Sequence, residues 1–170
     1  MSHVSGRPEI GRWLQTTVSD PSSGAVELIE LREHGGRLNP PGTFPVTYLV
    51  EDKESSRSEM SRWIQSETES GSRFVTLMVD LHLPKVLDLC DASVRKTLGV
   101  SLAALAGGED MALTQSIGVA AHEAEFGGVV YPRALGHGAR NLAVFNDRTT
   151  DQEISIVGAA DLDTRRSRND

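Results

Sequence analysis

Three residues whose side chains could bind and cleave a nucleotide follow one another at equal intervals in the first half of the chain. Arg37, Tyr48 and Glu59 stand eleven residues apart. A guanidinium group can bind two phosphate oxygens at once, and a tyrosine ring can stack on a flat heterocycle. A carboxylate can hold a ribose hydroxyl and stabilise the positive charge that develops at an anomeric carbon during glycosidic cleavage. Together the three residue types suit a nucleotide as the ligand.

Each of the three residues also has an ordinary structural interpretation. Arg37 could cap a turn, and Tyr48 could belong to the core of a strand. Glu59 stands three residues after Ser56, which is the spacing of a capping box at the start of a helix. Residue type and spacing alone leave both interpretations open.

The elements that would position these residues can be read from the surrounding sequence. Segment 34–42, HGGRLNPPG, contains the arginine, and its glycines and prolines predict a structured loop. Segment 45–50, PVTYLV, contains the tyrosine and predicts a strand from its β-branched and aromatic residues. Segment 52–66 contains the glutamate, and its apolar residues recur at helical spacing. We therefore expect a loop, a strand and a helix to carry one site.

The rest of the chain mixes short strands and helices without regular alternation, which favours an α+β fold with mixed sheets and flanking helices. The helix expected at 111–126 has an apolar stripe formed by Leu113, Ile117, Ala120, Ala121 and Ala124. We expect an N-terminal extension, partly irregular, over 1–24, a catalytic domain over 25–160, and a frayed charged tail over 161–170. Strands are further expected at 73–83, 86–89, 129–131, 141–145 and 154–157, a strand or short helix at 25–31, and short helices at 93–98 and 101–106.

Composition excludes several classes of protein. The chain has 170 residues, a formal net charge of −7 and one cysteine, Cys90. An acidic protein is a poor main partner for nucleic acid, and one cysteine cannot form an intrachain disulfide. No stretch is apolar enough for a membrane helix, and the first residues do not resemble a secretory signal. The expected location is the cytoplasm.

Common catalytic motifs are also missing from the sequence. It has no P-loop, no dinucleotide-binding glycine fingerprint and no nucleophile elbow. His122 and Glu123 begin a zinc-protease motif, but Phe126 stands where the second histidine would be. We therefore expect no metal.

Four segments, in order, resemble the motifs of the RES-domain family, which is named for its Arg, Glu and Ser. The first is GGRLNPPGTFPVTYLVEDKESSRSEM, at 35–60, and the second is LDLCDASVRKTLGV, at 87–100. The third is MALTQSIGVAAHEAEFGGVVYP, at 111–132, and the fourth is NLAVF, at 141–145. The resemblance spans about residues 30 to 146 and keeps the order of the motifs.

The resemblance implies a fold similar to the ADP-ribosyltransferase toxins and a toxin of a toxin–antitoxin pair. Such proteins consume NAD⁺ by hydrolysis or phosphorolysis of the nicotinamide–ribose bond, and some transfer ADP-ribose to a protein. By position, Arg37 matches the arginine that binds NAD⁺, Tyr48 the tyrosine on the nicotinamide side, and Glu59 the catalytic glutamate. The implied partner is an Xre-type helix-turn-helix antitoxin that blocks the active site. A homodimer is left open.

The chain departs from the family pattern at one place. The family usually has serine after the Tyr-Pro pair, whereas here Arg133 follows Pro132. Arg133 could bind a phosphate, pair with Glu59 and shut the site, or lie at the surface of a loop. There are two alternatives to an NAD⁺-degrading toxin. One is an ADP-ribosyltransferase that modifies a protein, which shares the pocket and differs only in the acceptor. The other is a catalytically degenerate protein kept for partner binding, which the departure at Arg133 favours. Further candidates for polar contacts are Asn39, Gln115 and His137, and Arg140 is expected to join Arg37 and Arg133 in one anion-binding cleft.

Overall fold

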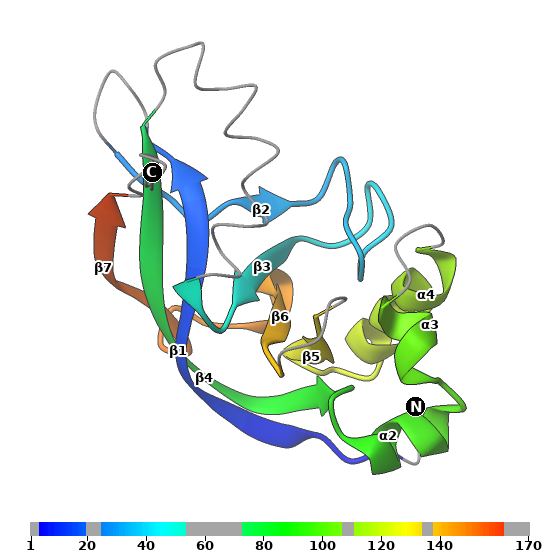
Figure 1. The fold of residues 1–170 in the computed structure, drawn as a ribbon. Coiled ribbons are helices and arrows are strands. Elements are labelled where there is room, and N and C mark those ends of the chain that lie inside the picture. The colour runs from blue at the N-terminus through cyan, green and yellow to red at the C-terminus, as the bar shows by residue number, and fades with distance from the viewer. Residues whose placement is uncertain (1–3, 20–24, 54–72, 107–110, 134–137, 162–170) are drawn as a thin grey trace, which may run out of the picture.

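The computed structural model describes residues 4–19, 25–53, 73–106, 111–133 and 138–161 (Figure 1). One mixed sheet of seven strands forms the centre of this part of the chain, and the helices gather at one end of it. The strands are β1 (Arg7–Val18), β2 (Glu30–Leu31), β3 (Val46–Val50), β4 (Phe74–Asp88), β5 (Gly128–Pro132), β6 (Arg140–Phe145) and β7 (Ile154–Asp161). The helices are α2 (Ala92–Leu98), α3 (Leu102–Ala106), α4 (Ala112–Glu123) and the 3-10 turn η2 (Asn146–Arg148).

The strand pairings form a closed circuit. The order β1-β3-β6-β5-β4-β7 runs across the sheet, and β1 also pairs with β4 along its whole length. Five strands therefore close on themselves, while β2 extends the sheet beside β3 and β7 extends it beside β4. β4 and β5 are parallel, and the other pairs are antiparallel. The described part of the chain is thus a single domain in which one mixed sheet dominates and a few helices flank it, as expected for the α+β class.

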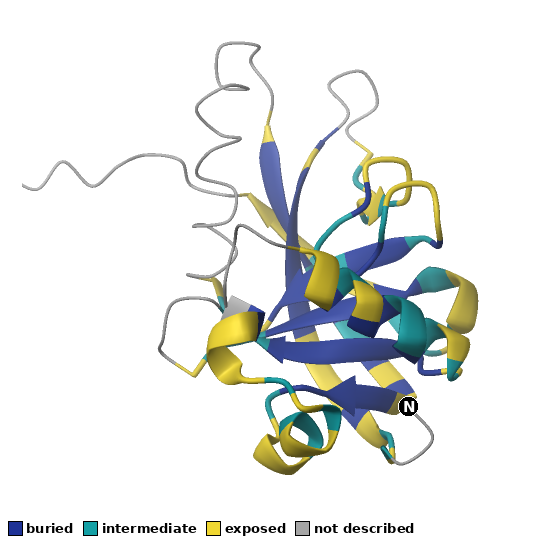
Figure 2. Ribbon diagram, turned by 90° about the vertical axis from the view of Figure 1, so that its right-hand side faces the viewer, coloured by how far each residue is buried: buried dark blue, intermediate teal, exposed yellow. Residues whose placement is uncertain are grey.

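Side chains that alternate along β5 and β6 divide the core into two clusters. Val130 and Leu142 lie in one cluster with Trp13 of β1, inside the closed circuit of strands. Val129 and Ala143 lie in the other cluster, which α3 and α4 cover. The period of two along a strand places neighbouring residues on opposite faces, so each strand serves both clusters. Figure 2 shows the buried strands behind the helices, whose outer faces are exposed.

β4 is one strand where the sequence predicts two. It continues through Pro84, which lacks the backbone N–H that a strand ladder uses. Between Leu83 and Val86, β4 has one residue more than the facing segment of β1, which is a β-bulge. On the other edge, the pairing with β7 ends at Leu81 and the pairing with β5 begins at Val86. Pro84 therefore lies where neither edge needs its donor.

The N-terminal segment contributes a strand to the central sheet. Residues 7–18, placed in a partly irregular extension, form β1, a twelve-residue strand that pairs with β3 and β4. Trp13 of β1 is 1% exposed and belongs to the core. The serines, glycines and prolines around this segment hid the strand from local sequence reading, and its partners β3 and β4 are distant in sequence. At the other end, Asp161 belongs to β7 and residues 162–170 lie outside the described residues.

The expected helix at 111–126 is confirmed as α4, but only Ile117 and Ala121 of the predicted apolar stripe are buried. The buried side is formed by Thr114, Ile117, Gly118 and Ala121, whereas Leu113 is 38% exposed. Small residues on this side let the helix approach the loop that precedes β3. None of the helices among the described residues is long and apolar enough to span a membrane.

Candidate active site

The loop between β2 and β3 is held together by one buried asparagine. Asn39 has no exposed surface, and its Nδ2 donates to the carbonyl oxygens of Leu31 at 2.7 Å and Phe44 at 3.1 Å. Its backbone carbonyl accepts from Gly36 N at 2.8 Å, which closes a turn around Arg37. The structure thus shows Asn39 bonded within the loop, and a contact of Asn39 with a ligand stays a prediction. Asn39 acts as a positioning residue because its amide is used inside the loop.

Tyr48 fastens the same loop to the sheet. Its hydroxyl donates to Asn39 Oδ1 at 2.8 Å and accepts from the Leu38 N–H at 2.8 Å. A Cβ at Gly36 would lie 2.6 Å from this hydroxyl, so the loop can pass over the ring only because residue 36 is glycine. Burial raises the pKa of Tyr48 to about 12, against the opposing effect of the two loop N–H groups and Arg37. At neutral pH the hydroxyl is therefore a neutral donor and acceptor.

The raised pKa of Tyr48 predicts a loss of stability in alkaline solution. Since the native state favours the protonated hydroxyl, the folded chain binds more protons than the unfolded chain between about pH 10 and pH 12. This contribution is present below pH 10 and is lost as the pH rises through 12. In Tyr48→Phe the decrease in the free energy of unfolding between pH 10 and pH 12 that Tyr48 causes should disappear. At pH 8 the free energy of unfolding should fall by about 1–3 kcal/mol, because Asn39 loses its partner. Urea unfolding of both proteins at pH 8 and pH 11 measures this, and equal slopes would contradict the assignment.

Arg37 belongs to this loop, and its side chain reaches the helices. Its Nη1 donates to the carbonyl oxygen of Leu105 in α3 at 2.8 Å, and its side chain is half-buried. A guanidinium group has five N–H donors in a rigid fork, so one bond to a backbone carbonyl orients the group. The arginine is thereby fixed beside Tyr48, whose ring approaches the same loop.

Helix α4 presses directly on the loop. Gln115 Nε2 donates to the Gly36 carbonyl oxygen at 3.0 Å, so its side chain positions the loop. A Cβ built on Gly118 would lie 1.8 Å from the carbonyl oxygen of Leu38, which means that only glycine fits there. Sequence reasoning missed Gly118, although a lone glycine among alanines within a helix is a signal of close packing.

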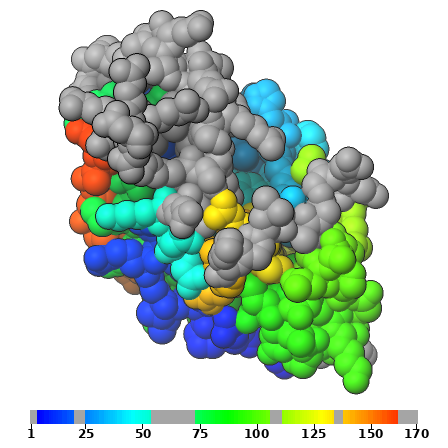
Figure 3. Space-filling view, in the orientation of Figure 1, coloured from blue at the N-terminus to red at the C-terminus, as the bar shows by residue number. Residues whose placement is uncertain are grey.

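The structure thus brings together Arg37, Tyr48, Asn39 and Gln115 around one loop. Arg133 is half-buried at the end of β5, and its N–H donates to Ala139 O at 3.2 Å, where the chain returns into β6. Two expected site residues, Glu59 and His137, lie outside the described residues. In the space-filling view, β3 in cyan and β6 in gold reach the surface between the helices and β7 (Figure 3).

Arg140 does not join Arg37, contrary to the expectation from its charge. Its guanidinium bonds Glu51 at 2.8 Å and Glu9 at 3.3 Å, and lies 5.3 Å from the ring centre of Trp13. Trp13 belongs to the core cluster on the other face of the sheet from Tyr48. The bond from Arg140 lowers the pKa of the Glu51 carboxyl, as expected for a strong ion pair. Arg140 therefore ties the beginning of β6 to β1 and to the residue that follows β3.

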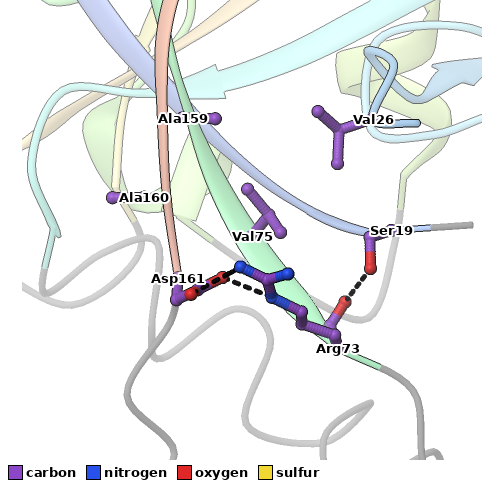
Figure 4. A pocket seen from close by; sticks show the side chains of 7 residues that line it. All are labelled: Ser19, Val26, Arg73, Val75, Ala159, Ala160 and Asp161. Carbon is purple, nitrogen blue, oxygen red and sulfur yellow. Dashed lines mark hydrogen bonds and ion pairs between the residues drawn. The ribbon is translucent and has the colours of Figure 1, made fainter. Parts of the chain in front are cut away.

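A pocket of about 190 Å³ lies elsewhere, between the beginning of β4 and the end of β7 (Figure 4). Arg73 on its wall forms a double hydrogen bond with Asp161, at 2.6 Å for each contact. Ligand pockets usually measure about 300–1,000 Å³, and a dinucleotide needs a large one. The size of this pocket and the pairing of its arginine make it a poor candidate for a nucleotide site.

The fold and the loop define a class of protein: a single domain on a mixed sheet that holds an arginine and a tyrosine beside each other at a braced loop. The chain belongs to the RES domain family, whose model matches residues 9–164. That match begins within β1, which agrees with the place of this strand in the sheet.

Similar proteins agree with this membership. The NAD(+) phosphorylase MbcT of Mycobacterium tuberculosis is 28% identical over 136 residues, which are 77% of this chain and 72% of that protein. The protein of the same name from Mycobacterium bovis matches equally. The crystal structure of the M. tuberculosis MbcT–MbcA toxin–antitoxin complex contains a chain with the same fold, with a TM-score of 0.76 and 24% identity. The match covers 93% of this chain and 87% of that chain.

Proposed function

We propose that this protein is a toxin that degrades NAD⁺ by breaking the bond between nicotinamide and ribose. The observation that carries the proposal is the RES family match over nearly the whole domain, since the family relative MbcT is named as an NAD(+) phosphorylase. The braced arginine loop supports it, because a fixed guanidinium group suits a diphosphate.

The roles of the residues follow from their chemistry. Arg37, together with Arg133, binds the diphosphate, and Tyr48 orients the nicotinamide and its ribose. Glu59 contacts the ribose and stabilises the oxocarbenium-like charge as nicotinamide leaves. Asn39 and Gln115 hold the loop that presents Arg37. Tyr48 can orient a ligand with its ring, because its hydroxyl is already bonded to Asn39 and Leu38.

The proposed reaction needs no added oxidant or reductant. The bond between the anomeric carbon and the pyridinium nitrogen breaks, and its electron pair goes to the ring, so that neutral nicotinamide leaves. An oxygen of inorganic phosphate then bonds to the same carbon and gives ADP-ribose 1-phosphate. With water in place of phosphate, the product is ADP-ribose and a proton is released. The positive charge of the bound pyridinium makes it a good leaving group.

We further propose a protein partner, a cytoplasmic location and a relation of the fold to the ADP-ribosyltransferase toxins. The solved relative is in a toxin–antitoxin complex, in which its partner is MbcA. An Xre-type antitoxin that covers the site containing Arg37 would suit a toxin that consumes a cofactor needed throughout the cell. The catalytic unit includes β1, so it extends further toward the N-terminus than residue 25.

The purified chain, incubated with NAD⁺ and inorganic phosphate, tests the proposed reaction. We expect nicotinamide to be released and ADP-ribose 1-phosphate to form, as followed by chromatography. Intact NAD⁺ would overturn the proposal. Transfer of labelled ADP-ribose to a protein would favour the transferase alternative. Absence of both cleavage and NAD⁺ binding would favour the degenerate protein that the change at Arg133 suggests.

Arg37→Lys should weaken the use of NAD⁺ more than it weakens the fold. Lysine keeps the charge but loses the two-pronged contact with phosphate, so we expect kcat/KM to fall about 30-fold, mainly through KM. Arg95→Lys is a matched control, because Arg95 also donates to backbone carbonyls, those of Leu89 and Cys90 at 2.8 Å. Steady-state kinetics of both variants measures the difference. Equal losses in the two would show that Arg37 is only a structural brace.

A further inference from the structure

One buried polar group remains without a partner in the described structure, and it lies on β6. Asn141 is 7% exposed, and its side-chain Oδ1 finds no hydrogen-bond donor among the described residues. Two other asparagines of the described structure have side-chain oxygens that do accept a hydrogen bond. Asn39 and Asn146 use their side-chain oxygens as acceptors, from Tyr48 and from Thr47 N. Buried polar groups are nearly always bonded, so an unbonded one calls for an explanation.

The register of the sheet places Asn141 opposite Tyr131 on one side, opposite Val50 on the other, and diagonal to Tyr48. Asn141 faces Tyr131 directly on β5, and β6 lies between β3 and β5 (Figure 1). Tyr48 faces Ala143, two residues along β6 from Asn141 and on the same face of the sheet. A diagonal pair of this kind has its residues about 7–8 Å apart. Tyr48, Asn141 and Tyr131 therefore share one face, the face that carries the Arg37 loop.

Packing alone does not account for an amide at this position. A leucine has the same branched shape and would not bury an unbonded oxygen, and replacement of polar groups by apolar groups of the same shape can be nearly neutral or stabilising. The neighbouring residues on the same face, Ala143 and Phe145, are apolar members of the core cluster. Asparagine is thus retained where the core favours an apolar side chain, which points to a ligand that supplies the missing donor.

We infer that Asn141 is a specificity residue whose Oδ1 accepts a hydrogen bond from the carboxamide NH₂ of nicotinamide. This inference rests on the proposed reaction with NAD⁺. The unbonded atom is an acceptor, so the ligand must present an N–H or O–H to it. The flat nicotinamide ring can stack on the ring of Tyr48, as proposed above, whereas the charged diphosphate belongs beside Arg37. The carboxamide is the donor that this ring carries.

An analogue of NAD⁺ isolates this hydrogen bond. In 3-acetylpyridine adenine dinucleotide, a methyl group replaces the NH₂ of the carboxamide. We expect the wild-type chain to prefer NAD⁺ to this analogue in kcat/KM, and the preference to fall about tenfold in Asn141→Leu. Intrinsic differences between the two leaving groups cancel in this comparison. The melting temperature of Asn141→Leu should equal or exceed that of the wild type, and Asn141→Ala replaces it in the assay if the leucine variant does not fold.

Asn146→Leu is the matched control. Its amide is fully bonded, to Glu30 and Thr47, so leucine should lower the melting temperature there and leave the preference for NAD⁺ unchanged. A preference that is unchanged in the Asn141 variants overturns the inference while the proposed reaction stands. If the wild type does not cleave NAD⁺, the proposed reaction fails, and calorimetry with nicotinamide and 3-acetylpyridine then decides on Asn141. Equal affinities for the two compounds, or binding of neither, would overturn it.

Discussion

Gly118→Ala should destabilise the protein by about 3 kcal/mol, even though alanine is the better helix former. The new methyl group would lie 1.8 Å from the carbonyl oxygen of Leu38, well inside contact distance, and that oxygen belongs to the backbone. Either α4 or the loop that holds Arg37 must move. For a chain of this length the melting temperature should fall by about 10 °C.

The sign of this effect separates packing from helix propensity. Glycine within a helix usually costs about 1 kcal/mol relative to alanine, so propensity alone predicts that Gly118→Ala is stabilising. The close approach of α4 to Leu38 reverses that expectation. Because Leu38 stands between Arg37 and Asn39, any protein that still folds should also lose NAD⁺ cleavage.

Gly127→Ala provides the control. Gly127 is buried too, but the nearest atom to its added Cβ would be 3.6 Å away, an ordinary contact. Its backbone lies outside the left-handed region, so alanine should be accepted with little change in stability. Differential scanning calorimetry of both variants makes the comparison. Equal melting temperatures for Gly118→Ala and the wild type would show that α4 does not press on the loop.

Glu59→Gln should lower kcat for NAD⁺ cleavage by about 10³-fold and leave the melting temperature unchanged. Glutamine has the same shape and can still bond a ribose hydroxyl. It lacks the negative charge that stabilises an oxocarbenium-like transition state, so the loss should fall on kcat and leave KM nearly unchanged.

Glu59 lies outside the described residues, so its assignment as the catalytic glutamate rests on the order of the motifs. Glu54→Gln is therefore a useful control, since it removes one carboxylate from the same segment without touching the motif position. Its kcat should match that of the wild type. Activity in Glu59→Gln that is within tenfold of the wild type would exclude the carboxylate as the group that stabilises the reacting carbon.

Local sequence was enough to place most elements around the site. The glycines and prolines of 34–42 indicated a loop, and β3, β5, β6 and α4 lie close to the segments that their apolar spacing predicted. Pro84 misled that approach, because a proline usually ends a strand and here it occupies a bulge. The bulge depends on which strands flank β4, and this is not visible in a local window of sequence.

For individual residues too, the sequence indicated the residue type, whereas the partner of the side chain became visible only in the structure. Arg37 and Tyr48 were identified by type and motif, and the structure holds both at one loop. Asn39 was expected to bind a ligand, yet it is buried and braces the loop, and Arg140 was expected beside Arg37, yet it pairs with Glu9 and Glu51. Charge and polarity are properties of a residue, whereas the partner of a side chain depends on the fold.

By itself, then, the sequence determined the family, through four motifs in order, and the residue types available for chemistry on NAD⁺. Only the tertiary structure decided that β1 belongs to the sheet, that Leu38 lies against Gly118, and that the side-chain Oδ1 of Asn141 is buried with no hydrogen-bond partner among the described residues. The physical reason is that these features depend on contacts between segments far apart in the chain, such as the 79 residues that separate Gln115 from Gly36. Periodicity along a segment indicates which of its faces is apolar, and the segment's partners in the fold determine what that face meets.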